Sequence, residues 1–136
     1  MNYFTWGGYQ DNPAGLIFKA TVNYNKGAYI YNYKQLDASN TLVTLQDTNG
    51  DGNNDQAMVT VIAPYDGYCS SVVLDVMNKT LQPIKISDIA ISESGPIDVK
   101  MLEGSTSVIR SGARKAIGFD FTVTGSDPCS FTVTLP

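Results

Sequence analysis

The stretch Cys129-Ser130-Phe131-Thr132-Val133-Thr134-Leu135-Pro136 alternates apolar and polar residues up to the last position of the chain. Successive side chains of a β-strand point to opposite faces of a sheet, so this alternation predicts a strand with one buried and one solvated face. Similar stretches precede it at residues 72–77, 84–86, 97–101 and 117–124. Turn-forming Gly, Pro, Asn and Asp separate them at intervals of about 10 to 15 residues, a spacing typical of β-sandwiches. We therefore expect an all-β fold, a two-sheet antiparallel sandwich of jelly-roll or immunoglobulin-like type.

Composition narrows the classes of function. The chain has 136 residues, 43% hydrophobic and 16% charged, which suits one globular domain. Its net charge of −4 and scattered Lys and Arg argue against nucleic acid as a partner. No apolar run approaches the ~18 residues of a membrane span, so we expect no membrane insertion of the mature form. The chain contains no His, which removes the usual catalytic triads, and an enzyme is the least expected class.

The first 15 residues differ from the rest. They are dense in aromatic residues and then break into a turn-forming stretch at residues 10–15. We expect an N-terminal extension at residues 1–15 and a single sandwich domain at residues 16–136, with its first strands at 16–23 and 28–34. Exposed aromatic rings in a row would form a sticky patch, so the sandwich itself or a neighbouring molecule must cover them.

Three tyrosines, Tyr29, Tyr31 and Tyr33, alternate along the expected strand at residues 28–34. A period of two places all three on one face of the sheet. Such a ladder is typical of cross-strand packing on a half-exposed face, and it would also suit a platform for sugar rings. Glycans are therefore considered as partners.

The loop at residues 47–55 is the sharpest local motif. Oxygen-bearing side chains at its first, third and fifth positions, followed by Gly52, match the opening of a Ca²⁺ loop. The twelfth position, where a bidentate Glu belongs, is Met58, and strands flank the loop, so it is no EF-hand. A weaker structural Ca²⁺ site and a plain hairpin loop with Asn-Gly and Asp-Gly turns both remain open. The candidate ligands are Asp47, Asn49, Asp51, Asn53 and Asp55.

Two further features depend on the cell compartment. Cys69 and Cys129 are the only cysteines. In an exported protein they could form one disulfide, worth about 4 kcal/mol in the chain-entropy view, or else be two separate core residues. Asn78 opens the only N-x-[ST] sequon, a candidate for glycosylation. Few Lys and Glu with many Thr, Asn and Tyr favour an extracellular or cell-surface protein, in its mature form after removal of a signal peptide.

From Leu42 to Pro136 the order of motifs resembles the TasA/camelysin-type biofilm-fibre proteins, in particular the archaeal bundling-pilus subunits related to them. The motifs are the loop at residues 47–55, Tyr-Asp-Gly-Tyr at 65–68, and Asn-Lys-Thr-Leu-Gln-Pro at 78–83. The family pattern has Pro where this chain has Asp66, and a Gly that is missing after Asn78. The aromatic opening also looks like the start of a mature subunit. The resemblance covers about two thirds of the chain.

This resemblance implies a structural subunit of an extracellular filament. Such subunits polymerise by donor-strand complementation, in which the N-terminal segment of one copy adds a strand to the next. A contact of this kind does not close on itself and gives a filament, a homopolymer of neighbouring copies. The donor residues would be Tyr3, Phe4, Thr5, Trp6 and Tyr9. The rival interpretation is a monomeric Ca²⁺-assisted carbohydrate-binding module or surface adhesin, and a third is an immunoglobulin-like appendage of a larger assembly.

Overall fold

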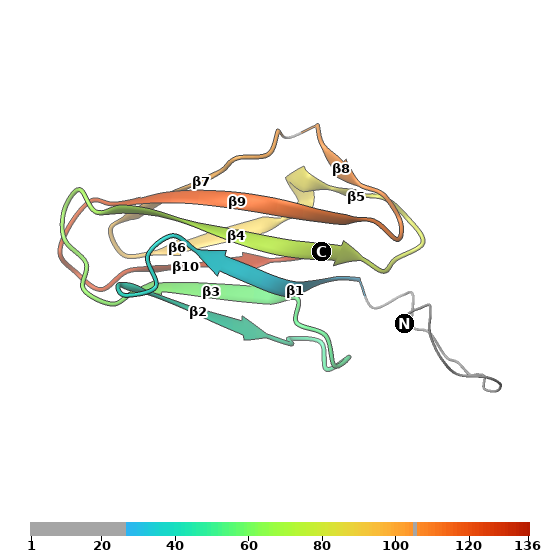
Figure 1. Ribbon diagram of the computed structural model, residues 1–136, viewed down its shortest axis with the longest axis horizontal. Helices are drawn as coiled ribbons and strands as arrows, with labels where there is room; N and C mark the ends of the chain where they lie inside the picture. The colour runs from blue at the N-terminus through green and yellow to red at the C-terminus, as the bar shows by residue number, and fades with distance from the viewer. Residues whose placement is uncertain (1–26, 105) are drawn as a thin grey trace.

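A computed structural model describes residues 27–104 and 106–136, which form a β-sandwich (Figure 1). Alternating β-branched and aromatic residues supply the strands, with Gly at positive φ in several of the turns between them. A 3₁₀ turn, η2, spans Ile86–Asp88. The strands are β1 (Ala28–Gln35), β2 (Thr41–Gln46), β3 (Gln56–Val61), β4 (Cys69–Asn78), β5 (Ile84–Lys85), β6 (Ala90–Ser94), β7 (Ile97–Met101), β8 (Val108–Ile109), β9 (Arg114–Val123) and β10 (Ser130–Thr134).

Two four-stranded sheets make the two layers. One has the strand order β1-β4-β9-β7, the other β2-β3-β10-β6, and β5 pairs with β8 as a separate short ribbon. The strands pair antiparallel throughout the described residues. The chain changes sheet between β1 and β2, β3 and β4, β6 and β7, and β9 and β10, and it also passes from β4 to β6 of the other sheet by way of β5. The predicted fold class, an all-β two-sheet antiparallel sandwich, is confirmed.

The core lies between the two sheets and follows the predicted period of two. Every second residue of β4, from Ser70 to Asn78, is buried, as are alternate residues of β9 and β10. Phe121 of one sheet meets Phe131 of the other with ring centroids 5.4 Å apart, and Phe119 lies 6.5 Å from Phe131. Tilted aromatic pairs of this kind add packing energy beyond the buried area. The alternating stretch at the end of the chain is thus a central strand, β10, between β3 and β6.

Two strands have no counterpart in the sequence prediction. Strand β6 carries Ile91 as its one large apolar residue, and β8 has only two residues. Neither presents enough alternation to be recognised. The expected strand at residues 16–23, and the boundary between residues 15 and 16, lie outside the described residues. In the described part of the chain no helix has the length and hydrophobicity to cross a membrane.

Candidate functional site

The five residues predicted to form the donor strand lie outside the described residues. They are Tyr3, Phe4, Thr5, Trp6 and Tyr9. The structure therefore bears on the rest of the site: the tyrosines of β1, the loop at 47–55, the sequon, the cysteines and the margins of the two sheets.

The three tyrosines of β1 do not share one face. The register of β1 on β4 skips Tyr31, because the strand has a bulge there. Before the bulge Tyr29 pairs with Met77, on the outer face, and after it Tyr33 pairs with Leu74, which is buried in the core. Paired residues lie on the same face of a sheet, so Tyr33 points to the space between the sheets. The single-face ladder expected from the sequence is wrong, since one extra residue reverses the alternation.

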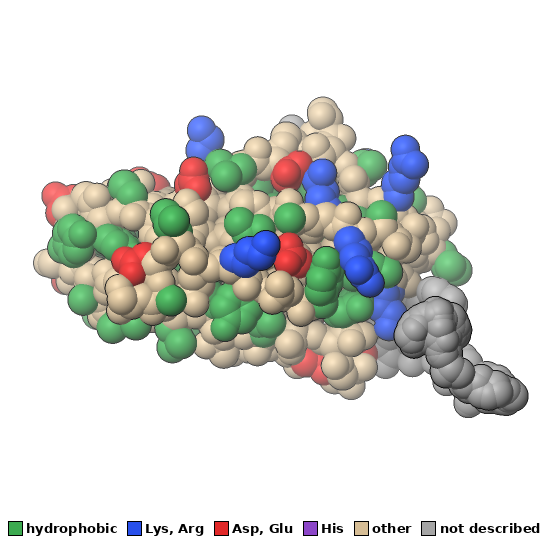
Figure 2. All heavy atoms as spheres, in the orientation of Figure 1, with side chains coloured by type: hydrophobic (Ala, Val, Ile, Leu, Met, Phe, Trp, Pro, Cys, Tyr) green, Lys and Arg blue, Asp and Glu red, His purple; other side chains and the backbone are tan. Residues whose placement is uncertain are grey.

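The two outer tyrosines are partly covered by cations. The rings of Tyr29 and Tyr31 meet edge to face at 6.3 Å. The Lys79 ammonium lies 5.4 Å from the ring of Tyr29, and the Arg114 guanidinium lies 5.3 Å from that of Tyr31. Cation–π contacts of this kind use the ring faces on which a sugar would stack. On the face shown in Figure 2, basic and acidic side chains are interspersed with hydrophobic ones.

In the loop at residues 47–55 the oxygen-bearing side chains bind the loop's own backbone. The Asp47 carboxylate accepts hydrogen bonds from the N–H groups of Gly50, at 2.9 Å, and Gly52, at 2.8 Å. These bonds, the one from Gly52 foremost, hold the pKa of Asp47 below its usual value. Asn49 accepts from the N–H of Asp51, and Asp51 accepts from that of Asn53. These are the local turns typical of Asn and Asp.

Asp55, the last residue of the loop, binds Thr48 near its beginning. It is buried, and its carboxylate accepts hydrogen bonds from the backbone N–H of Thr48, at 2.7 Å, and from the Thr48 hydroxyl. Its own backbone joins β2 to β10, through the Gln46 carbonyl and the Leu135 N–H. Within residues 27–104 and 106–136 no group of three or more Cys, Asp or Glu side chains is gathered as a metal site would require. Hairpin-turn chemistry accounts for the loop geometry, and calcium binding stays a prediction.

The predicted glycosylation site is corrected by the structure. Asn78 is fully buried, and its Nδ2 donates to the carbonyl oxygens of Gln82, at 2.8 Å, and Ile109, at 2.9 Å. Its Oδ1 accepts from the N–H and the hydroxyl of Thr80. An N-linked glycan is attached through Nδ2. Because this atom is buried and donates both its hydrogens, the folded chain has no room for a glycan there.

The predicted disulfide is not formed either. Cys69 and Cys129 are free, the first exposed and the second buried. The buried residues of β4 begin at Ser70, so Cys69 points away from the core, whereas Cys129 shares the inward face of Phe131. Two cysteines whose side chains point in different directions cannot be bridged without moving the backbone. Burial raises the pKa of the Cys129 thiol.

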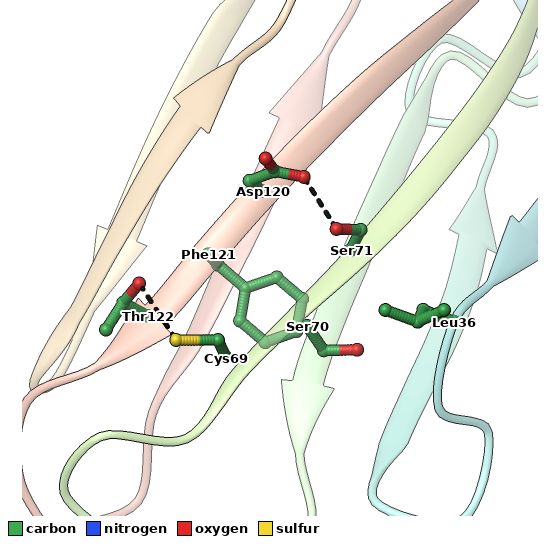
Figure 3. Close-up of a pocket in the computed structure, with 7 residues that line it drawn as sticks. All are labelled: Leu36, Cys69, Ser70, Ser71, Asp120, Phe121 and Thr122. Carbon is green, nitrogen blue, oxygen red and sulfur yellow. Dashed lines mark hydrogen bonds between the residues drawn. The ribbon is translucent and has the colours of Figure 1, made fainter.

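A shallow cleft of about 280 Å³ surrounds Cys69 (Figure 3). Leu36 lies at one side, and residues 69–71 and 120–122, from β4 and β9, form the floor. The polar groups here bind one another: the Ser71 hydroxyl donates to Asp120 Oδ1 at 2.6 Å, and Cys69 Sγ lies 3.5 Å from the Thr122 hydroxyl. Asp120 therefore faces Ser71 rather than the thiol, and the cleft holds no base positioned to activate the sulfur.

Within residues 27–104 and 106–136, four edge strands form the margins of the two sheets: β1 and β7 in one sheet, β2 and β6 in the other. A margin is where an incoming strand can pair, because its backbone N–H and C=O groups face outward. The family resemblance implied a donor strand but named no acceptor strand, since pairing order is decided by contacts far apart in the chain. Comparison of the chain with protein-family models, curated proteins and solved structures gave no match. The resemblance to the biofilm-fibre proteins therefore stays a prediction.

Proposed function

We propose that the protein is the structural subunit of an extracellular filament, a bundling pilus or biofilm-matrix fibre, assembled head to tail by donor-strand complementation. The observation that carries the proposal is that the chain has two parts, an aromatic N-terminal segment and a sandwich with its own hydrophobic core. The buried hydrophobic residues of the described part run from Ala28 to Leu135 and form one core cluster. The aromatic segment at residues 1–15 precedes this cluster in the chain, and its run of aromatic side chains suits the anchor of a donor strand.

Donor-strand complementation between two copies is a form of strand addition. The donor segment contributes backbone hydrogen bonds along an open sheet margin, and its alternate side chains give the contact its specificity. Because donor and acceptor are different surfaces of one chain, each added copy presents a new acceptor, and the assembly grows as a filament. Trp6 and its aromatic neighbours would anchor the segment, as buried aromatic residues do in other interfaces.

The rival, a carbohydrate-binding module, uses the tyrosine face and the loop at 47–55. In the structure the bulge separates Tyr33 from Tyr29 and Tyr31, and the loop oxygens bind backbone N–H groups. Neither feature favours a sugar site, so the filament is the better-supported proposal.

The test is electron microscopy of the purified full-length chain at high concentration, beside a variant that lacks residues 1–12. We expect filaments from the full chain and monomers from the deletion. Trp6→Ala should raise the concentration needed for assembly at least tenfold, since loss of a central anchor costs about 2 kcal/mol or more. Tyr65→Ala, an exposed aromatic residue in the body, is the matched control.

Filaments that persist without residues 1–12 would overturn the proposal. A full chain that stays monomeric and binds polysaccharide in a pull-down, with the binding lost in Tyr29→Ala, would establish the rival.

A further inference from the structure

We propose that the margin of β2 that faces away from β3 is the acceptor surface, and that residues 3–9 of a neighbouring copy pair with it. This inference rests on the proposed function and adds the place of contact. It follows from comparing the four margins, three of which carry features that hinder strand addition.

A side chain of β6, which belongs to the other sheet, blocks the margin of β7. The Val99 N–H points away from β9 and donates to Glu93 Oε2 at 2.8 Å, and the Ile97 N–H donates to the Gly95 carbonyl. Glu93 pairs with Phe131, so it is an inward-facing charge on the marginal strand β6. Inward charges and occupied N–H groups are the means by which natural sheets prevent unwanted pairing.

The margin of β1 is also protected. The bulge at Tyr31 interrupts its register, and Lys34 places a charge on its second half. In its first half the Ile30 N–H already donates to the Asn54 carbonyl at 2.8 Å.

Strand β2 has none of these features. Its sequence, Thr-Leu-Val-Thr-Leu-Gln, contains no charge and no proline, and its register on β3 is continuous from Thr41 to Gln46. The carbonyl groups of Asn40 and Gln46 face β3, so by alternation Val43 and Leu45 direct their backbone groups outward. In the described part of the chain β3 is the only strand that pairs with β2. In Figure 1 β2 is the lowest strand of the sandwich.

Two hydrogen bonds join the β1 side of the molecule to the segments at the two ends of β2 and β3. At one end the Gln35 side chain donates to the Thr41 carbonyl at 2.8 Å, and at the other Ile30 binds Asn54. Tyr33 lies two residues before Gln35 on β1, and Val43 lies two residues after Thr41 on β2. Tyr33 faces the interior yet is 37% exposed. An apolar side chain entering here would cover it.

The occupant is the aromatic segment because its alternation fits this margin. In a strand, Phe4 and Trp6 lie on one face and Tyr3 and Thr5 on the other. The first pair would enter the space beside Tyr33, and the second would lie beside Leu42, which is 56% exposed on the outer face of β2. The contact needs no charge on either side, and residues 3–9 and β2 both lack one.

The decisive experiment places one lysine on either margin of the same sheet. Leu45 and Ile91 are both partly buried, and both face inward on marginal strands, opposite Ala57 and Val133. Leu45→Lys should abolish filaments seen by electron microscopy, whereas Ile91→Lys should leave them intact. Circular dichroism melts of both variants confirm that they fold. Filaments from Leu45→Lys, or their loss in Ile91→Lys alone, would overturn the assignment.

Mixing separates this inference from the proposed function. Leu45→Lys keeps the donor, and the variant lacking residues 1–12 keeps the acceptor, so together they should form a one-to-one pair on size exclusion. If the full chain polymerises through its N-terminal segment but this pair does not form, the acceptor lies elsewhere and the proposed function stands. If the full chain does not polymerise at all, both fail.

A second measurement does not depend on any substitution in the body. A synthetic peptide of residues 1–12 is added to the chain that lacks them, and amide hydrogen exchange is followed. Exchange at Val43 and Leu45 should slow, because their N–H groups would gain partners, while exchange at Val99 should stay unchanged. Peptide binding with unchanged exchange at Val43 and Leu45 would overturn the assignment.

Discussion

Asn78 joins the end of β4 to the segment that follows it and to β8. Its side chain makes four hydrogen bonds, and its backbone binds the turn at Gly112 and Ala113. A sequon in a turn usually indicates an exposed asparagine. Here the same residue types build a buried polar hub, in which every donor and acceptor of the side chain has a partner.

We expect Asn78→Ala to cost about 2–4 kcal/mol of unfolding free energy, because the carbonyl groups of Gln82 and Ile109 lose their donor. Thr80→Val, which removes only a hydroxyl from the same hub, should cost about 1 kcal/mol. Urea unfolding measures both. Equal losses in the two variants would contradict the central role of Asn78.

The two thiols should differ in reactivity. In the native protein a thiol reagent should label Cys69 alone, because Cys129 is 4% exposed and the raised pKa keeps its thiol protonated. Denaturation without reductant should expose both, and Cys69→Ser should remove native labelling. If the denatured chain is not labelled and its mass is two hydrogens below that of the reduced chain, Cys69 and Cys129 form the disulfide expected from the sequence.

The carboxylate of Asp37 makes the free energy of unfolding depend on pH in the acid range. The Ser39 hydroxyl, and then the Tyr68 hydroxyl at 2.8 Å, donate to its carboxylate and lower its pKa. A depressed folded pKa contributes stability above the unfolded value of about 3.9, and this is lost as pH falls through the folded value.

We therefore expect Asp37→Asn to be less stable than the native chain at neutral pH, with the difference shrinking below about pH 4. Urea midpoints measured across this range test it. Asp66→Asn, at an exposed carboxylate, is the control. A difference that is constant with pH would show that the charge of Asp37 does not matter.

At the scale of elements, the turn between β6 and β7 depends on one glycine. Gly95 has φ +82°, and a Cβ there would lie 2.3 Å from the Pro128 carbonyl oxygen. Gly112 has a similar φ of +77° but open space around it. We expect Gly112→Ala to cost about 1 kcal/mol for the left-handed backbone.

Gly95→Ala should cost about 2–4 kcal/mol, since the β6–β7 turn must also move away from the segment before β10. Thermal unfolding of the two variants separates the steric contribution from the backbone one. Equal melting temperatures would mean that the turn can shift freely.

At the scale of the whole molecule, the described residues account for a continuous core, from Ala28 to Leu135. We expect a chain of residues 27–136 to fold alone and to melt near the temperature of the full chain measured below its assembly concentration. Phe131→Ala in this short chain should cost about 3–5 kcal/mol, as a control that the melt reports the core. A short chain that aggregates or lacks a cooperative melt would show that residues 1–26 complete the core of their own molecule.

The fold class could be predicted because burial on one face of a sheet imposes the alternation seen at residues 72–77, 117–124 and 129–136. The candidate site could be predicted only in part. The loop at 47–55 was found by its spacing, but spacing cannot tell oxygens that bind a cation from oxygens that bind backbone N–H groups. The buried state of Asn78 and the bulge at Tyr31 depend on partners distant in the chain, and no local pattern contains them.

The sequence by itself determined that this chain is a β-sandwich and which faces of its central strands are buried, since both follow from residue polarity at a period of two. Tertiary structure alone decided which strands lie at the margins, where Tyr33 points, and that Cys69 and Cys129 face different ways. These depend on strand order and register, which are set by hydrogen bonds between residues far apart in the chain.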